Sequence, residues 1–96
     1  MKTYVIDIDG VLCDDVGWDL DDYLNRKPIK ENIDKINNLT NQGNRVILFT
    51  SRPWGMWEIT TDWLEENDVL YTFLIMGKPY GDVYVDDKSI KIEELE

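Results

Sequence analysis

The amino-acid sequence predicts an α/β fold built on a mostly parallel sheet. Apolar, β-branched runs alternate with segments of helical period, and the connections between them are short. The run from Tyr4 to Ile8 is largely apolar at successive positions, which is typical of a strand buried on both faces. We therefore expect one minimal domain over residues 1–96, with helices on both faces of the sheet in three layers.

The first half of the chain contains two strands around one helix. Tyr4 to Ile8 is the first strand, and residues 11–27 show no period, so they should form a surface loop or small flap. A helix is predicted over about 29–42, because apolar residues recur there at helical spacing: Ile29, Ile33, Ile36 and Leu39. Residues 45–50 are again β-branched and apolar, and predict the second strand.

The second half repeats this alternation. A second helix ends near Asn67, and one of its faces is marked by Met56, Ile59 and Trp63. Residues 71–76 and 82–85 predict a third and a fourth strand. Ser89 is expected to cap a last acidic turn or helix that runs to Glu96.

The link between the last two strands is unusually short. Five residues lead from Lys78 to Val83, which reach about 17 Å at ~3.3–3.6 Å per residue. A helical crossover between parallel strands needs about ten or more residues. The strand at 71–76 is therefore displaced or antiparallel, or the link runs extended without a helix.

Composition excludes several classes of function. Twenty acidic residues against ten basic ones give a net charge of −10, which disfavours a nucleic-acid partner. The sequence has no histidine and one cysteine, Cys13, so histidine-activated nucleophiles and Cys/His zinc sites are excluded. The apolar runs are too short to span a bilayer or to form a signal peptide, and we expect a cytoplasmic protein without a membrane partner.

Carboxylates remain as the groups that can carry chemistry. Asp7 and Asp9 are two apart in an extended segment, so their side chains should share one face. One carboxylate can attack phosphorus to form an acyl-phosphate, while the other protonates the leaving oxygen and later takes a proton from water. A phosphate dianion repels the nucleophile, which predicts a divalent cation, most simply Mg²⁺.

Polar residues at the other strand ends complete the set. Thr50 offers a hydroxyl to a phosphate oxygen, and Lys78 offers a positive charge to the same oxygens. Asp86 and Asp87 supply a further carboxylate for the metal ion. In parallel sheets these strand ends gather at one edge, where ligands bind.

These residues resemble the haloacid dehalogenase-like (HAD) phosphohydrolases, whose four motifs come in the same order. The first motif resembles residues 7–11, the second 49–51, the third Lys78 and the fourth 85–87. The resemblance extends from residue 4 to about 90. The stretch from Met76 to Ile90 is similar to small cap-less members described as capsule-biosynthesis phosphatases.

The resemblance implies a Rossmann-like fold and a role for each residue. Asp7 would be the nucleophile and a metal ligand, and Asp9 would be the general acid/base with its backbone carbonyl on Mg²⁺. Thr50 and Lys78 would be phosphate ligands. The matching motif favours Asp87 over Asp86 as the direct metal ligand. The family's cap domain has no room between these motifs, so the site should be open, or a neighbouring subunit of a homo-oligomer should close it.

The leading hypothesis is therefore a Mg²⁺-dependent phosphatase acting on a sugar phosphate, a nucleotide or another phosphomonoester. Two alternatives come from other classes: a receiver-like signalling domain and a catalytically silent Mg²⁺-binding interaction module. The order of the acidic motifs argues against a receiver domain. Within the enzyme class, a nucleotidase and a polynucleotide-end phosphatase remain open, although the net charge disfavours the second.

Further candidates for substrate contact lie near the second strand and in the flap. Ser51 belongs to the second motif, and Arg52 either binds the substrate or pairs with a helix. Trp18 and Trp54 are better candidates for substrate contact than Trp63, whose place on the periodic helix face predicts a core residue.

Overall fold

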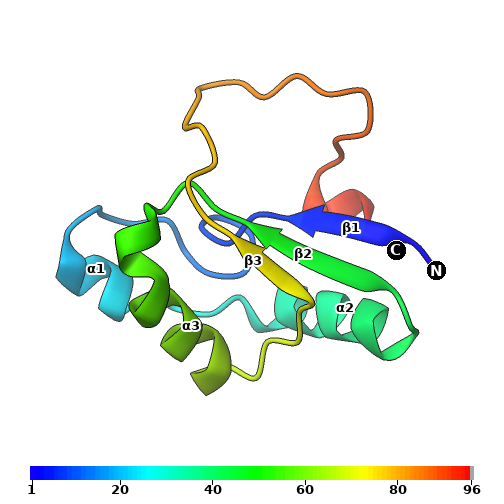
Figure 1. The fold of residues 1–96 in the computed structure, drawn as a ribbon, viewed down its shortest axis with the longest axis horizontal. Helices are drawn as coiled ribbons and strands as arrows, with labels where there is room; N and C mark the ends of the chain where they lie inside the picture. The colour runs from blue at the N-terminus through cyan, green and yellow to red at the C-terminus, as the bar shows by residue number, and fades with distance from the viewer. Residues whose placement is uncertain (96) are drawn as a thin grey trace.

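The fold is a three-stranded parallel sheet with helices packed on one face (Figure 1). It is seen in a computed structural model, which describes residues 1–95. The strands are β1 (Thr3–Ile6), β2 (Arg45–Phe49) and β3 (Phe73–Ile75). The helices are α1 (Leu20–Leu24), α2 (Lys30–Asn41) and α3 (Trp57–Glu66), with short 3-10 turns η1 (Trp54–Met56) and η2 (Ile92–Glu94).

The strands lie in the order β1-β2-β3, and the core lies between the sheet and the helices α2 and α3. Tyr4 pairs with Val46 and Leu48 pairs with Leu74, so these alternate positions face the helices together. The remaining buried apolar residues come mostly from the helices and the ends of the strands: Ile6, Ile8, Ile33, Ile36, Leu39, Trp63, Leu64 and Met76. The prediction of Trp63 as a core residue is confirmed.

The described residues form two layers, not the three expected. In both β-α-β units the crossover is right-handed by the general rule, and the strand order advances in one direction. Both crossing helices therefore lie on the same face, as Figure 1 shows for α2 and α3. On the opposite face, Val5, Phe73 and Ile75 leave 60%, 55% and 43% of their surface exposed.

Of the alternatives left open for the segment after the third strand, the structure matches the link without a helix. β3 is parallel to β2 and directly paired with it, and the chain beyond it contains no crossover helix up to residue 95. The predicted strand over 82–85 is wrong, because this segment is exposed and unpaired, with Val85 93% exposed. The hydroxyl of Tyr84 donates to the carbonyl of Pro79 and accepts from the amide of Gly81, so the chain curls into a local loop.

The chain returns to the core only near its end. Figure 1 shows the segment after β3 arching away from α2 and α3. The 3-10 turn η2 then lies beside α2, where Lys35 Nζ donates to the carbonyl of Ile92 at 3.4 Å. A turn rather than a full helix follows Ser89, within the alternatives that the sequence left open.

The flap over residues 11–27 contains one short helix that the sequence did not predict. Asp19 precedes α1, and its amide donates to the carboxylate of Asp22 at 3.0 Å. This contact gives a hydrogen-bond partner to a backbone amide at the start of the helix. No helix of residues 1–95 is long and apolar enough to cross a membrane.

Candidate active site

A cavity of about 390 Å³ opens at the carboxyl ends of β1 and β2. Asp7 and Asp9, which follow β1, and Ser51 and Arg52, which follow β2, line it. The two aspartates share this side because Ile8 between them is fully buried toward the helices. Both carboxylates therefore line the same cavity, as the spacing in the sequence predicts for their geometry.

Lys78 lies beside Asp7. Its Nζ is 3.4 Å from Asp7 Oδ2, and the amide of Ile8 donates to the other oxygen of the same carboxylate at 2.8 Å. Burial nevertheless raises the pKa of Asp7, because the lowering by Lys78 and this amide is smaller than the effect of desolvation. The carboxylate remains about one-third exposed and accessible from the cavity.

Lys78 is positioned by the backbone of the neighbouring strand ends. The amide of Lys78 donates to the carbonyl of Thr50, and the amide of Thr50 donates to the carbonyl of Ile75. The ammonium group also lies 4.3 Å from the ring centroid of Tyr84, within cation–π range. The pairing of β2 with β3 thus places Lys78 next to Asp7, the candidate nucleophile.

Asp9 is held by two buried arginines. Arg52 donates from Nε to Oδ2 at 2.9 Å and from Nη2 to Oδ1 at 2.8 Å, and Arg26 donates from Nε to Oδ1 at 3.2 Å. Burial raises the pKa of Asp9, but the hydrogen bonds and charge of Arg52, with the charge of Arg26, outweigh it, and the pKa is lowered overall. Asp9 is therefore an anchored carboxylate.

Both arginines are also tied to other elements. Arg52 Nη1 donates to Thr60 Oγ1 of α3 at 3.0 Å, so Arg52 pairs with a helix, one of the alternatives that the sequence left open. The guanidinium carbons of Arg26 and Arg52 lie 4.5 Å and 4.9 Å from the ring centroid of Tyr23. These contacts join the flap, the sheet and α3 around a single carboxylate.

Arg26 is a site residue that the sequence prediction missed. Its Nη1 and Nη2 donate to the carbonyls of Val16 and Gly17, which fixes the flap, and Trp63 Nε1 donates to the backbone carbonyl of Arg26. One signal was present in the sequence, since Arg26 is the first base after a run rich in aspartate. The pairing with Asp9 spans seventeen positions and depends on the path of the flap.

The second predicted motif has a structural role in this arrangement. Thr50 is fully buried, and its hydroxyl oxygen accepts from the amide of Arg52 at 3.2 Å. Ser51 is partly exposed and lines the cavity. Of the two hydroxyls, that of Ser51 is thus the more accessible to a substrate.

The predicted metal-ligating pair at the end of the chain is not brought to the other carboxylates. Asp86 and Asp87 lie on the exposed segment after β3, and Asp86 Oδ1 accepts from the amide of Lys88. Residues 1–95 contain no group of three or more aspartate, glutamate, cysteine or histidine side chains able to hold a metal ion. Asp7, however, offers a carboxylate to the cavity, and Mg²⁺ in phosphate sites is commonly bound by only one or two carboxylates together with the substrate's phosphate.

Cys13 lies under the site as a buried thiol. Its Sγ is 3.4 Å from Asp9 Oδ1, and the side chain has no exposed surface. Burial, followed by the charge of Asp9, raises the pKa of Cys13 to about 12. The thiol is thus protonated and inert at neutral pH, as expected for a core residue.

Aromatic side chains surround the opening of the cavity. Trp18 of the flap contacts Tyr80 edge to face, with ring centroids 5.1 Å apart, and both line the cavity. Trp54 instead stacks on Trp57 outside the cavity lining. Of the two tryptophans predicted to contact substrate, only Trp18 is placed to do so.

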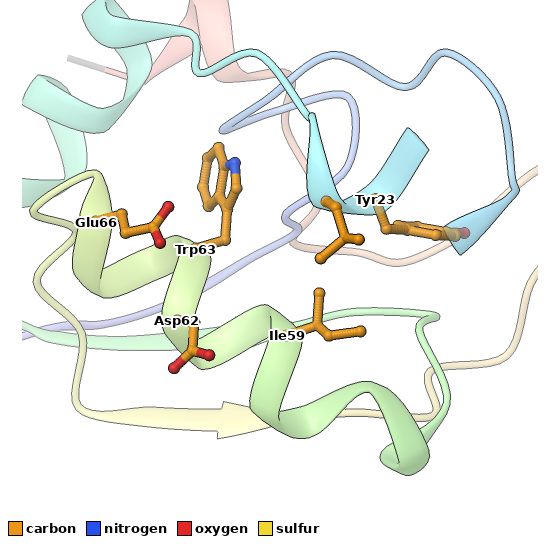
Figure 2. Close-up of a pocket in the computed structure, with 6 residues that line it drawn as sticks. Tyr23, Ile59, Asp62, Trp63 and Glu66 are labelled. Atoms are coloured by element: carbon orange, nitrogen blue, oxygen red, sulfur yellow. The ribbon is translucent and has the colours of Figure 1, made fainter. Parts of the chain in front are cut away.

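A second, smaller pocket of about 130 Å³ lies between α1 and α3 (Figure 2). Figure 2 shows Tyr23 on one side of it and Ile59, Asp62 and Glu66 along α3 on the other. Its lining holds no basic side chain to bind phosphate. The cavity at the strand ends is therefore the better candidate for an active site.

Comparison with known proteins supports the fold. No family model matches the chain, and no curated protein matches it. An MCSG target from Vibrio cholerae has a similar structure, with a TM-score of 0.83 and 25% identity over 99% of this chain and 87% of its own. A chain of the Pnkp1/Rnl/Hen1 complex matches with a TM-score of 0.71 and 25% identity over 96% of this chain, which spans 32% of that protein.

Proposed function

We propose that the protein is a Mg²⁺-dependent phosphomonoester hydrolase that works through an aspartyl-phosphate on Asp7. The observation that carries the proposal is the pairing of Asp7 with Lys78 at the edge of a cavity that also contains Asp9. A carboxylate beside a cation, open to a cavity, is suited to attack a phosphoryl group that the cation helps to neutralise. The order of the four motifs along the chain, which resembles that of the HAD phosphohydrolases, supports the same reaction.

In the first step, an oxygen of Asp7 attacks phosphorus and the bond from phosphorus to the leaving oxygen breaks. The phosphoryl group is then held as a mixed anhydride on Asp7, and the alcohol departs. Lys78 stabilises the negative charge on the phosphoryl oxygens as it shifts during this transfer. Ser51, which follows β2 and lines the cavity, is the proposed hydroxyl ligand of the phosphate, whereas the Thr50 hydroxyl is buried beneath it.

In the second step, water attacks phosphorus, the bond from phosphorus to the Asp7 oxygen breaks, and inorganic phosphate leaves while the Asp7 carboxylate is regenerated. Asp9 takes the proton from this water, because Arg52 and Arg26 keep its carboxylate ionised, although the same lowering of its pKa makes it a weaker base. Protonation of the leaving alcohol by Asp9 requires that the two arginine contacts weaken first. The turnover should therefore depend strongly on how acidic the leaving alcohol is.

The metal ion is proposed on the chemistry of its ligands. Asp7 would hold Mg²⁺ through its carboxylate together with the backbone carbonyl of Asp9, and with Asp87 or Asp86 after movement of the exposed segment. Bound there, Mg²⁺ would neutralise the phosphate dianion that otherwise repels Asp7. The substrate class is a sugar phosphate, a nucleotide or another phosphomonoester.

The test is a phosphatase assay with an aryl phosphate, run with Mg²⁺ and with excess chelator. We expect turnover only with Mg²⁺ and none in the Asp7→Asn variant. Asp34→Asn, an exposed aspartate on α2 paired with Lys30, is the matched control and should keep full activity. Full turnover in the chelator, or in Asp7→Asn, would refute the mechanism, and an inactive wild-type protein would favour a silent binding module.

A further inference from the structure

We propose that Trp18 and Tyr80 form a ring-binding mouth of the cavity, and that the substrate is a nucleoside monophosphate whose base stacks on these rings. The inference rests on the proposed phosphatase function and specifies its substrate. Trp18 and Tyr80 come from the flap and from the segment after β3, and they meet at the cavity that contains Asp7. Two distant segments thus place aromatic rings at one opening.

Both rings are left open to solvent. Trp18 is 60% exposed and Tyr80 is 67% exposed, although they contact each other edge to face. Exposed aromatic surface next to a polar cavity is typical of a binding site, because burying it against a ligand is favourable. The edge-to-face arrangement leaves ring faces free for a planar partner.

Each ring lies close along the chain to residues that are linked to one of the two carboxylates. The carbonyls of Val16 and Gly17, just before Trp18, accept hydrogen bonds from Arg26, which also binds Asp9. Tyr80 follows two residues after Lys78, which contacts Asp7. A ligand with its phosphate at Asp7 and its base at the mouth would therefore contact residues that belong to one connected network.

The remaining lining favours a base over an extended polyanion. Tyr23 and Tyr84 add two more rings, and Asp15 adds a negative charge. The three nearby cations are already paired, Arg26 and Arg52 with Asp9 and Lys78 with Asp7. These three cations are balanced by the carboxylates of Asp7, Asp9 and Asp15, so no positive charge is left for the further phosphates of a polynucleotide or a nucleoside triphosphate.

The test compares adenosine monophosphate, ribose 5-phosphate and glycerol 2-phosphate in steady-state assays with Mg²⁺. In Trp18→Ala and Tyr80→Ala we expect the KM for adenosine monophosphate to rise about tenfold, the effect of losing one base–aromatic stack, with kcat nearly unchanged. The KM and kcat for glycerol 2-phosphate should not change. Trp18→Phe and Tyr80→Phe, which keep a ring, should restore most of the affinity, and Trp57→Ala, outside the cavity lining, is the control.

Three outcomes would overturn the inference. An equal loss for all three substrates would show a structural role for the two rings. An equal loss for ribose 5-phosphate and adenosine monophosphate would assign the rings to the sugar. Failure of wild-type protein to prefer adenosine monophosphate over glycerol 2-phosphate would refute base recognition while leaving the phosphatase function intact.

A binding measurement separates this inference from the proposed function. Adenosine monophosphate should quench the tryptophan fluorescence of the Asp7→Asn protein, and the quenching should be lost in Asp7→Asn combined with Trp18→Ala. Ribose 5-phosphate should quench neither protein. Absence of selective quenching would refute the inference even in a protein that hydrolyses no substrate.

Discussion

Arg52 binds both carboxylate oxygens of Asp9, at 2.9 Å and 2.8 Å, from a side chain that is almost fully buried. This bidentate pair joins the segment after β1 to the loop after β2, across forty-three positions in the chain. The geometry fixes the orientation of Asp9 while leaving Asp7 free to face a substrate. The Arg52–Asp9 pair should therefore contribute both to the stability of the fold and to the orientation of a proposed catalytic carboxylate.

Arg52→Met should destabilise the fold because it leaves a largely buried carboxylate with Arg26 as its remaining charged partner. Breaking a buried ion pair costs about 3–5 kcal/mol, and the remaining partner places the expected loss near the lower end, about 3 kcal/mol. Urea unfolding measures this loss. Arg45→Met, at the exposed start of β2, is the control, and an equal shift in both variants would contradict the account.

Lys78→Met should lower kcat with little effect on the fold, because Lys78 is a partly exposed residue whose main contact is Asp7. Removing one positioned electrostatic group from a transition state typically costs about 10²–10³-fold in kcat. Steady-state kinetics with an aryl phosphate measures this. Lys88→Met, on the exposed segment after β3, should leave kcat near the wild-type value.

Cys13 should be unreactive in the folded protein. Its thiol has no exposed surface and its pKa is raised to about 12, so thiol reagents should label it at pH 8 only as fast as the chain unfolds. The same shift predicts that stability is fully present below pH 9.0, the ordinary pKa of a cysteine thiol, and falls as the pH rises toward 12, since only the unfolded chain then carries a thiolate. Cys13→Ala should lack this part of the pH dependence, and rapid labelling of native protein would contradict the burial of the thiol.

Mg²⁺ should protect the segment after β3 from proteolysis if Asp87 or Asp86 is a ligand. In the structure this segment is exposed and outside the sheet, so a protease should cut it readily in a chelator. Loss of protection in Asp87→Asn but not in Asp86→Asn would identify Asp87 as the ligand. Equal cutting with and without Mg²⁺ would exclude both residues from the metal site.

Much of the site could be predicted because parallel strands bring their carboxyl ends to one edge. Asp7, Asp9 and Lys78 follow strands whose apolar runs are evident in the sequence, and the structure places them together. The helices α2 and α3 were predicted within a few residues, since their apolar period is clear.

Features that depend on longer-range choices could not be predicted. Val83 to Val85 have strand propensity, but three such residues do not decide whether a strand pairs, and here Tyr84 bonds to its own loop. The number of layers depends on the order of the strands in the sheet, and this order cannot be deduced from the periodicity of apolar residues. Arg26 required the path of the flap, a segment without a repeating pattern.

The most direct test of the proposed chemistry is to trap the phosphoryl group. Asp9→Asn protein, mixed with an aryl phosphate and Mg²⁺ and quenched in acid, should carry one phosphoryl group on Asp7, because the leaving group departs without help while the water lacks its base. Peptide mapping by mass spectrometry locates that group, and Asp7→Asn combined with Asp9→Asn should carry none. A phosphoryl group on any other residue, or rapid turnover by Asp7→Asn without an intermediate, would contradict the account.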